Sequence, residues 1–572
     1  MKRIIAIAAA ILAVAGANAL GSSNKQKVLK LDFTEQVVER KTSSLDLTGL
    51  LSGSLSADQI TLLQYVRAID AAAQDPKISG IYMTPDNQSL GMAGAEEIRA
   101  ALARFRQSGK PVISYCNTLG NASYYLASVA DKVIVNPQSE NMLTGLSTMQ
   151  FFLKDALDAL GIEMQLIRHG KYKSAGEMYI RNDISPENRQ QYEELLGSIW
   201  DSWCQDISQS RGFTPQEFNS WIDGLELVLA QDFKERGIVD ETWFRHQVEE
   251  YLCQTFGFED IDQAKYIKIG KYAGKLKKGS FAKRIAVIYA DGEIVMDGSE
   301  SNIVGPKLAA TIQKVRKDPT IAGVVFRVNS PGGSVEASEI IRQEIKSLCH
   351  EKPVVVSYGD YAASGGYWIS AGAGQIFTDR STLTGSIGVF SMIPSVGQAV
   401  RSKLKVNPVT IGTNDHSTMT GAIEKLTADE QDYFQKQVEE IYEQFTGIVA
   451  EGRNLSQEFV DSIAQGRVWS GSESLKIGLT DKVGGLADAI AHMASQLGFG
   501  SNFRIVEYPE YQEVGILAML MGNTPDPDEN LTSGIQKTNV IDLEKAFPFA
   551  ASLRYLEGPA TYARLPFIMI AR

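Results

Sequence analysis

Tyr361-Ala-Ala-Ser-Gly-Gly-Tyr-Trp368 is the stretch around which this sequence is organised. The apolar run Pro353–Val356 before it reads as a buried strand, and the residues Tyr367–Ala371 can start a helix. A serine at such a passage, here Ser364, has an exposed hydroxyl and a backbone open to close approach. The helix beginning beside it directs free N–H groups towards developing negative charge. The stretch therefore predicts a nucleophile; the alternative is that its small residues only let a helix pack closely on a sheet.

The sequence contains two copies of one unit. Asp75-Pro-Lys-Ile-Ser-Gly80 recurs as Asp318-Pro-Thr-Ile-Ala-Gly323, and Tyr124 recurs as Tyr367, in both cases 243 residues later. Repeats of that length are whole domains rather than small repeat units. Within each copy, short β-rich runs such as Gly323–Val328 alternate with helical patterns. This alternation predicts an α/β domain with crossover helices, present twice in tandem.

Composition shifts divide the chain. The stretch between the copies is basic and contains glycine with little apolar pattern, which is typical of a linker. After about residue 500 the repeat pattern weakens. The predicted parts are a signal peptide or signal anchor (1–19), an N-terminal repeat (27–270), a linker (271–284), a C-terminal repeat (285–500) and a C-terminal extension (501–572).

Length and charge exclude several classes of protein. A chain of 572 residues is too long for one ordinary core. The net charge of −12 and the lack of a large basic block argue against nucleic acid as a partner. The cysteines are scattered without a C-x-x-C pattern, so we expect no zinc site, no other metal and no cofactor, and their disulfide state stays open.

The N-terminus carries a secretion pattern. Lys2-Arg3 precede an uncharged apolar run, Ile4–Ala17, which is followed by the small-residue site Ala17-Asn-Ala19. This order is typical of a cleavable signal. An uncleaved signal anchor is the alternative, because the run reaches Gly21 before polar residues follow. In both cases we expect the body of the protein to lie outside the cytoplasm.

The two copies differ where chemistry would occur. The second copy has Asn329-Ser-Pro-Gly-Gly-Ser334 after a buried strand, and its paired glycines can present backbone N–H groups as an oxyanion hole. The alternative is a tight turn selected for positive φ. The first copy reads Asp86–Leu90 at that place, without a glycine pair, and has Asn121 opposite Ser364. The first copy therefore lacks both the glycine pair and the serine, whereas the second copy has both, which favours a functional site in the second copy.

A nucleophilic serine needs a base. The five histidines are dispersed in unremarkable patterns, which disfavours a Clp-type His–Asp relay. Lysine is the other candidate, since Ser–Lys pairs occur in hydrolases. Lys173, in His169–Gly176 of the first copy, has Asp415 or His416 in the corresponding place of the second. The candidate base therefore belongs to one copy and the candidate nucleophile to the other.

Five motifs resemble those of bacterial signal peptide peptidases of the long, duplicated type (protease IV, peptidase family S49). The resemblance runs from about Val28 to Gly485. The motifs are Ser-Pro-Gly-Gly-Ser at 330–334, Ala-Ser-Gly-Gly-Tyr-Trp at 363–368, Leu-Thr-Gly-Ser-Ile-Gly at 383–388, Gly-Lys-Tyr-Lys-Ser-Ala at 170–175 and Gly-Arg-Val-Trp-Ser-Gly at 466–471.

The resemblance implies an α/β fold that is a tandem duplication of a Clp protease/crotonase-like domain. It implies a serine endopeptidase whose Ser–Lys dyad is assembled from the two repeats, with Ser364 as nucleophile and Lys173 as general base. Ser386 would orient the lysine. Backbone N–H groups near Gly332, Gly333 and Gly365 would bind the oxyanion.

It further implies a membrane-associated protein that faces the periplasm from the inner membrane, degrades hydrophobic remnants of signal peptides and forms a homo-oligomer, a tetramer by resemblance. The sequence leaves two other functions open: a crotonase-like acyl-CoA enzyme, and a non-catalytic membrane scaffold.

The dyad makes a geometric prediction. A lysine amine is neutral near pH 7 only if its pKa falls by about three units from roughly 10.4. Burial at the seam between the repeats, without a carboxylate partner, can lower it by desolvation. We expect Lys173 to be buried with its amine near Ser364 or Ser386, within one chain or between two chains.

Overall fold

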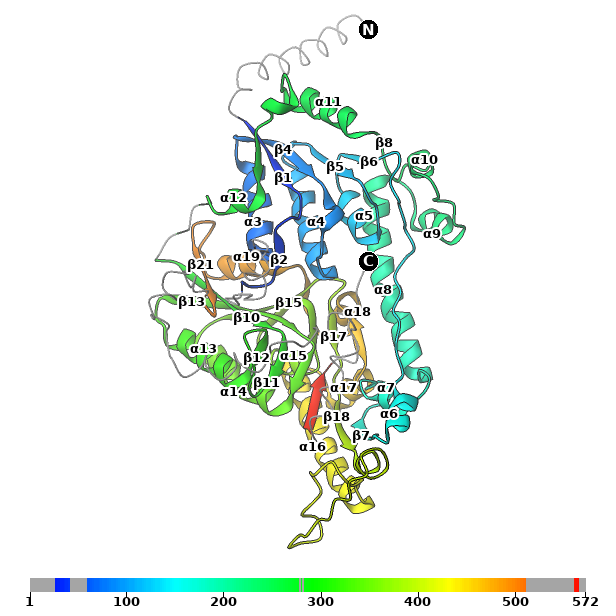
Figure 1. The fold of residues 1–572 in the computed structure, drawn as a ribbon. Coiled ribbons are helices and arrows are strands. Elements are labelled where there is room, and N and C mark those ends of the chain that lie inside the picture. Colours follow the sequence, from blue (N-terminus) through cyan, green and yellow to red (C-terminus); the bar gives the residue numbers. More distant parts are fainter. Residues whose placement is uncertain (1–25, 42–58, 277–278, 280–281, 511–559, 565–572) are drawn as a thin grey trace, which may run out of the picture.

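The computed structural model describes residues 26–41, 59–276, 279, 282–510 and 560–564. Each repeat contains a largely parallel sheet, and the sheet of the N-terminal repeat lies above that of the C-terminal repeat in Figure 1. The first sheet has the order β8 (Glu241–Thr242), β6 (Lys132–Val135), β5 (Val112–Cys116), β4 (Ile78–Met83), β1 (Lys27–Leu31) and β9 (Tyr266–Lys268).

The second sheet repeats this order. Its main strands are β20 (Lys482–Val483), β16 (Gln375–Thr378), β15 (Val354–Ala363), β13 (Ile321–Ser330), β10 (Arg284–Asp291) and β21 (Arg504–Tyr508). Two further strands, β17 (Leu383–Gly385) and β19 (Val468–Ser470), extend it beside β15. The matching strand order confirms the predicted tandem duplication of an α/β domain.

Some observed elements cross the predicted boundaries. Strand β21 lies beyond residue 500 but pairs with β10 as β9 pairs with β1, so the second domain continues at least to Tyr508. Helix α12 (Ile269–Ala273) occupies the start of the predicted linker. The predicted signal at 1–19, residues 277–278 and 280–281 of the linker, and residues 511–559 and 565–572 of the extension lie outside the described residues.

The helices begin where their capping residues predict. In α8 (Pro186–Arg211), the Ser185 side chain accepts a hydrogen bond from the Asn188 N–H. In α16 (Ala428–Arg453), Thr427 and Glu430 form a capping box. The apolar side chains of α16 at helical spacing, such as Val438 and Phe445, are buried in the core of the second repeat. Capping residues and apolar spacing of this kind favour helices that start at these positions.

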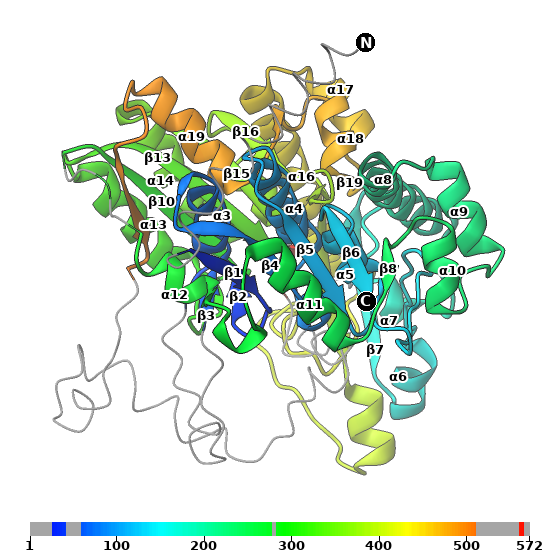
Figure 2. The ribbon, with the colours of Figure 1, turned by 90° about the horizontal axis from the view of Figure 1, so that it is seen from above.

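Helices of the first repeat separate the two sheets. Helices α3 (Leu62–Gln74) and α4 (Met92–Arg106) lie between them in Figures 1 and 2. Helix α4 packs against β15, and α3 packs against α19 (Leu486–Gln496) of the second repeat. The repeats therefore share a packed interface rather than standing apart.

A buried ion-pair network crosses this interface. Arg327 of β13 is 1% exposed and donates hydrogen bonds to Glu97 of α4 at 2.8 Å and to Glu39 at 2.7 Å. Glu97 also accepts from the Leu486 N–H at 3.0 Å. Burial raises the pKa of Glu97 to about 7, against the lowering effect of Arg327.

A third sheet lies beside the second sheet and contains strands of both repeats. Its order is β12 (Asn302–Val304), β11 (Glu293–Val295), β14 (Gly332–Ser334), β22 (Ala560–Arg564), β18 (Val389–Ser395) and β7 (Glu163–His169). Strand β7 belongs to the first repeat and pairs antiparallel with β18 of the second along its whole length. This pairing carries the segment after β7, which contains Lys173, into the second repeat.

Candidate active site

Ser364 occupies a strained turn between a strand and a helix. Strand β15 ends at Ala363, and α15 (Gly365–Trp368) follows at once. Ser364 has φ +55° and ψ −115°, a conformation that non-glycine residues rarely adopt. Its N–H donates to the Gly385 carbonyl at 2.8 Å, which holds the turn against β17. The strand runs further and the helix starts earlier than the sequence predicts, because Tyr361–Ala363 pair with β17.

Lys173 reaches this serine within the same chain. Its side chain is fully buried, and its Nζ lies 2.7 Å from the Ser364 Oγ. The same nitrogen lies 3.0 Å from both the hydroxyl and the carbonyl oxygen of Ser386. Burial alone lowers the pKa of Lys173 well below its usual value. The structure thus brings three of the predicted site residues together.

The lysine is held by the second repeat. The Tyr172 N–H donates to the Gln465 carbonyl at 2.9 Å. Gly466 has φ +78°, and a Cβ added to it would lie 2.5 Å from the Lys173 Cβ. Any larger residue there would displace the lysine. Gly466 begins the motif at 466–471, but its contact with Lys173 was not predicted from the sequence.

Contacts from its own repeat also restrain the lysine. Arg168, in β7, donates to the Lys173 carbonyl at 2.7 Å and to Glu177 at 3.2 Å. Glu177 is 1% exposed and accepts from the Ser185 hydroxyl at 2.7 Å. The backbone of Lys173 is therefore tied to the start of α8.

Ser386 presents two oxygens to the amine. It has φ +49°, and its N–H donates to the Arg467 carbonyl at 2.7 Å. This backbone conformation lets the hydroxyl and the carbonyl approach the same nitrogen. The contacts that the amine makes with Ser364 and Ser386 are all to uncharged oxygens, which is compatible with a neutral lysine.

The predicted oxyanion glycines lie beside the serine. Strand β14, which contains Gly332 and Gly333, packs against α15, and Gly365 is the first residue of α15. A Cβ on Gly333 would lie 2.0 Å from the Ile294 carbonyl, so a side chain is excluded there. The Gly332 N–H donates to the Ser330 hydroxyl at 3.2 Å.

The first repeat has a structural amide where the second has the serine. The Asn121 Oδ1 accepts hydrogen bonds from the N–H groups of Thr144 at 3.1 Å and Gly145 at 3.3 Å. These two residues correspond to Thr384 and Gly385, which flank the Ser364 turn. The side chain in the first copy therefore ties two loops together.

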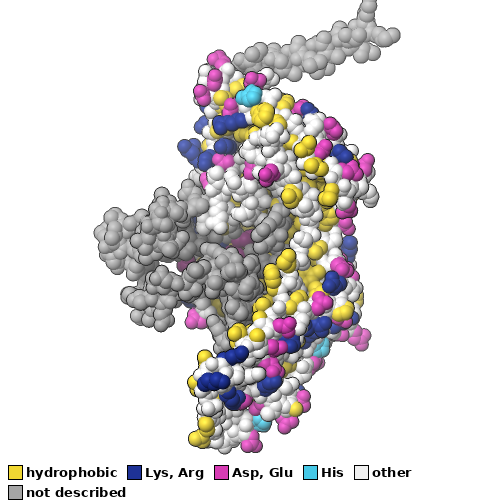
Figure 3. All heavy atoms as spheres, turned by 45° about the vertical axis from the view of Figure 1, so that its right-hand side comes forward, with side chains coloured by type: hydrophobic (Ala, Val, Ile, Leu, Met, Phe, Trp, Pro, Cys, Tyr) yellow, Lys and Arg dark blue, Asp and Glu magenta, His cyan; other side chains and the backbone are white. Residues whose placement is uncertain are grey.

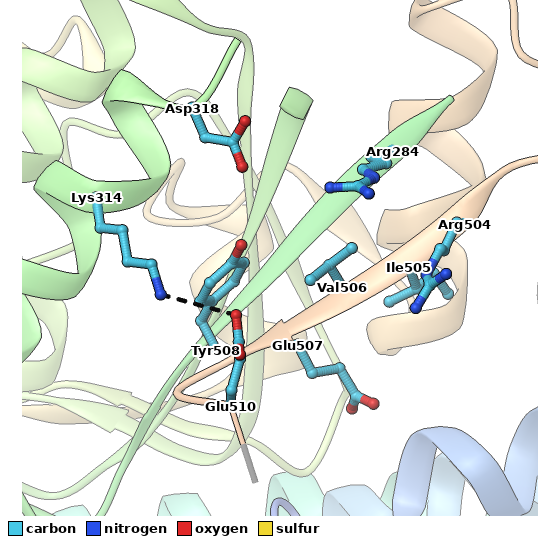
Figure 4. A pocket seen from close by; sticks show the side chains of 9 residues that line it. All are labelled: Arg284, Lys314, Asp318, Arg504, Ile505, Val506, Glu507, Tyr508 and Glu510. Atoms are coloured by element: carbon cyan, nitrogen blue, oxygen red, sulfur yellow. Dashed lines mark ion pairs between the residues drawn. The ribbon is translucent and has the colours of Figure 1, made fainter. Parts of the chain in front are cut away.

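Other candidate groups lie elsewhere. His169 stacks on Tyr442 with ring centroids 3.7 Å apart, and His416 pairs with Glu430. The pocket in Figure 4 is lined by residues of β10, α13 (Gly305–Lys317) and β21 and of adjoining segments, and an ion pair between Lys314 and Glu510 crosses it. Neither Ser364 nor Lys173 lines it.

The described residues contain neither a metal-binding cluster nor a membrane-spanning helix. No cluster of three or more His, Cys, Asp or Glu side chains suited to a metal ion occurs among them. None of the helices in this part of the chain combines the length and the apolar character needed to cross a membrane. The four cysteines, all within the described residues, are unpaired thiols.

Comparison with known proteins identifies relatives. Peptidase family S49 matches residues 104–257 and 346–499. Protease 4 of Salmonella typhi is 36% identical over 501 residues, covering 83% of this chain and 79% of that protein. The chloroplastic serine protease SPPA of Arabidopsis thaliana is 33% identical over 469 residues, covering 79% of this chain and 69% of that protein. A putative signal peptide peptidase SppA of Enterococcus faecium is 30% identical over 256 residues, covering 43% of this chain and 73% of that protein.

Proposed function

Because the chain belongs to peptidase family S49 and is a serine protease of the protease IV type, we propose that Ser364 is its nucleophile and Lys173 its general base. The observation that carries this assignment is the 2.7 Å distance between the buried Lys173 amine and the Ser364 hydroxyl. The predicted tandem duplication of an α/β domain is confirmed by the two family matches and the repeated parallel sheets. The family resemblance supports the Clp protease/crotonase type that we propose for each domain.

The reaction would proceed as an acyl transfer. The Ser364 hydroxyl donates its proton to the neutral amine of Lys173 while its oxygen attacks the peptide carbonyl. Ser386 orients the amine through the two oxygens it presents. Backbone N–H groups near Gly332, Gly333 and Gly365 stabilise the tetrahedral oxyanion. The lysine ammonium then protonates the leaving amine, and water hydrolyses the acyl-enzyme by the same steps in reverse.

The proposed substrates are cleaved signal peptides. These are apolar segments that can bind in extended form along a strand, where main-chain hydrogen bonds supply affinity without strict sequence demands. The name of the relative from Enterococcus faecium supports this substrate class. No metal and no cofactor takes part in the proposed reaction.

We place the protein in the cell envelope, associated with the inner membrane and facing the periplasm, as a homo-oligomer that is a tetramer by family resemblance. The signal-like residues 1–19 support the location. Exposed apolar side chains support an association surface, and Figure 3 shows such side chains gathered along one face. Two segments carry several of these exposed side chains. Segment 142–160 has Met142, Met149, Phe151 and Leu160, and segment 404–411 has Leu404, Val406, Val409 and Ile411.

The two other functions make different demands. A crotonase-like acyl-CoA enzyme needs the oxyanion glycines but no buried lysine beside a serine. A membrane scaffold needs neither group. The Lys173–Ser364 pair therefore favours the peptidase over both.

A peptide digest tests the proposal. The purified chain is incubated with a synthetic signal peptide, and the products are identified by mass spectrometry. We expect cleavage within the apolar segment by the native chain and by Ser347→Ala, whose serine lies away from the site on α14 (Val335–Glu351). Ser364→Ala should yield no products. Cleavage by Ser364→Ala at the native rate would refute the assignment.

A further inference from the structure

The third sheet contains a strand from the far end of the chain. Strand β22 (Ala560–Arg564) lies between β14 and β18 and is antiparallel to both. Gly332 faces Arg564 and Gly333 faces Ala563 on one side, and Phe390 faces Tyr562 on the other. In Figure 1 this strand is the red arrow beside β18. Residues that are more than 160 positions apart in the sequence thus form one continuous ladder.

Strand β22 lies next to the elements that carry the proposed catalytic groups. Strand β14 carries the two oxyanion glycines, and β18 follows directly from the loop that contains Ser386. Strand β7, on the far side of β18, leads to Lys173. Helix α15, which begins immediately after Ser364, contacts both β14 and β22. The slot between β14 and β18 is therefore bordered by the nucleophile, the base and the oxyanion glycines.

Resting on the proposed function, we propose that this slot is the peptide-binding site of the protease, and that residues 560–564 occupy it as a built-in competitor of substrate. A substrate binds there as an extended strand antiparallel to β14 and β18, since an unpaired strand edge is satisfied by adding a peptide strand. In the structure the same main-chain groups are already paired with β22. Substrate and β22 cannot pair with them at once.

The competition is intramolecular. A segment attached to its own binding site acts at an effective concentration of about millimolar, which a dilute substrate must overcome. The strand would therefore raise the apparent KM for peptides and leave kcat at saturation nearly unchanged. Displacement by abundant or tightly binding peptides opens the site.

Truncation gives the first test. A chain that ends at Pro559 loses β22, and a chain that ends at Arg564 keeps it and serves as the matched control. With an internally quenched signal peptide as substrate, we expect the shorter chain to show a KM lower by about tenfold or more, with kcat changed less than twofold. The control should match the full chain. An unchanged KM in the shorter chain would overturn the proposal.

A second variant keeps the chain length. Thr561→Pro together with Tyr562→Pro removes two successive N–H donors, which point to opposite sides of a strand, so pairing with both neighbours is impaired. This variant should reproduce the KM of the chain that ends at Pro559. A KM equal to that of the full chain would contradict the inference.

Binding can be measured without catalysis. A fluorescent peptide of residues 558–566 is titrated into the chain that ends at Pro559 and carries Ser364→Ala, with polarisation as the readout. We expect saturable binding, displacement by the quenched signal peptide, and no binding to the full-length Ser364→Ala chain. The same peptide with prolines at positions 561 and 562 is the control.

The outcomes separate the two proposals. If the peptide binds but no variant cleaves any signal peptide, occupation of the slot by residues 560–564 is supported and the proposed function is refuted. If the native chain cleaves peptides while the 558–566 peptide does not bind, occupation of the slot is refuted and the proposed function is supported. Circular dichroism of each variant checks that loss of binding does not come from unfolding.

Discussion

The Nζ of Lys173 lies 2.7 Å from the Oγ of Ser364 although 191 residues separate the two in sequence. One residue belongs to each repeat, and both side chains are fully buried. Strand β7 makes this meeting possible, because its pairing with β18 carries a segment of the first repeat into the second. Neither repeat alone contains both groups.

Removal of the amine should abolish activity. Lys173→Ala leaves Ser364 without a base, and loss of one member of such a catalytic unit lowers kcat on the order of a million-fold. Labelling of Ser364 by a fluorophosphonate should fall in parallel. Lys171→Ala is the matched control, since that lysine is exposed two residues away and lies over the Tyr172 ring. Undiminished labelling of Lys173→Ala would show that another group activates the serine.

The pH profile should report the buried lysine. Because burial lowers the pKa of Lys173, the neutral base forms well below the usual range near 10.4. We expect kcat/KM to fall towards acid pH with the slope of one proton and to be at its plateau before pH 10. The rate of fluorophosphonate labelling should follow the same curve. A midpoint near the ordinary lysine pKa would mean that the amine is solvated in solution.

The same burial should cost stability. A lysine with a lowered pKa in the folded state binds fewer protons there than in the unfolded chain, so its contribution to stability is full above its ordinary pKa and is lost as pH falls. Lys173→Met should therefore raise the free energy of unfolding at pH 7 by about 1 kcal/mol. Urea unfolding measures this change, with Lys171→Met as the control. A decrease in stability would argue against the desolvation cost.

Gly466 should be essential for the position of the lysine. A Cβ at this residue would lie 2.5 Å from the Lys173 Cβ, and φ +78° is unfavourable for alanine. Gly466→Ala should lower kcat about a hundred-fold, the effect of a displacement of about 1 Å at a reacting group. Gly447→Ala is the control, because its Cβ would meet just the Gln457 side chain at 3.8 Å. Equal kcat values for the two variants would contradict this role.

The interface between the repeats should weaken as pH rises. Burial raises the pKa of Glu97 to about 7, so its stabilising contribution is full below its ordinary pKa near 4.5 and is lost as pH rises through about 7. The urea midpoint of unfolding should therefore decrease as the pH is raised from 5 to 7.5. Glu97→Gln should reduce the pH dependence of the free energy of unfolding by up to about 1.4 kcal/mol per pH unit. Glu440→Gln, an exposed change on α16, should leave it intact. A Glu97→Gln chain with the native pH dependence would exclude Glu97 as its source.

Local sequence signals were enough for many elements. Ser185, Thr427 and Glu430 mark the starts of α8 and α16 in the sequence itself, because capping depends on side chains within three residues. The recurrence of Asp75–Gly80 at Asp318–Gly323 predicted the duplication, and the matching strand orders confirm it. The candidate residues Ser364, Lys173 and the glycine pair followed from the differences between the copies and from family resemblance. Their chemical roles stay predictions.

Tertiary structure decided the arrangement of the site. The turn at Ser364 is shaped by pairing of Tyr361–Ala363 with β17, which no local pattern shows. The contact of Gly466 with Lys173 depends on how two loops from different repeats meet. The strand β22 pairs with β14 and β18 from residues far along the chain, where the sequence predicted no more than a C-terminal extension. Propensity and periodicity act over a few residues, whereas these contacts depend on the packing of both domains, so the sequence determined the parts and the fold determined which of them touch.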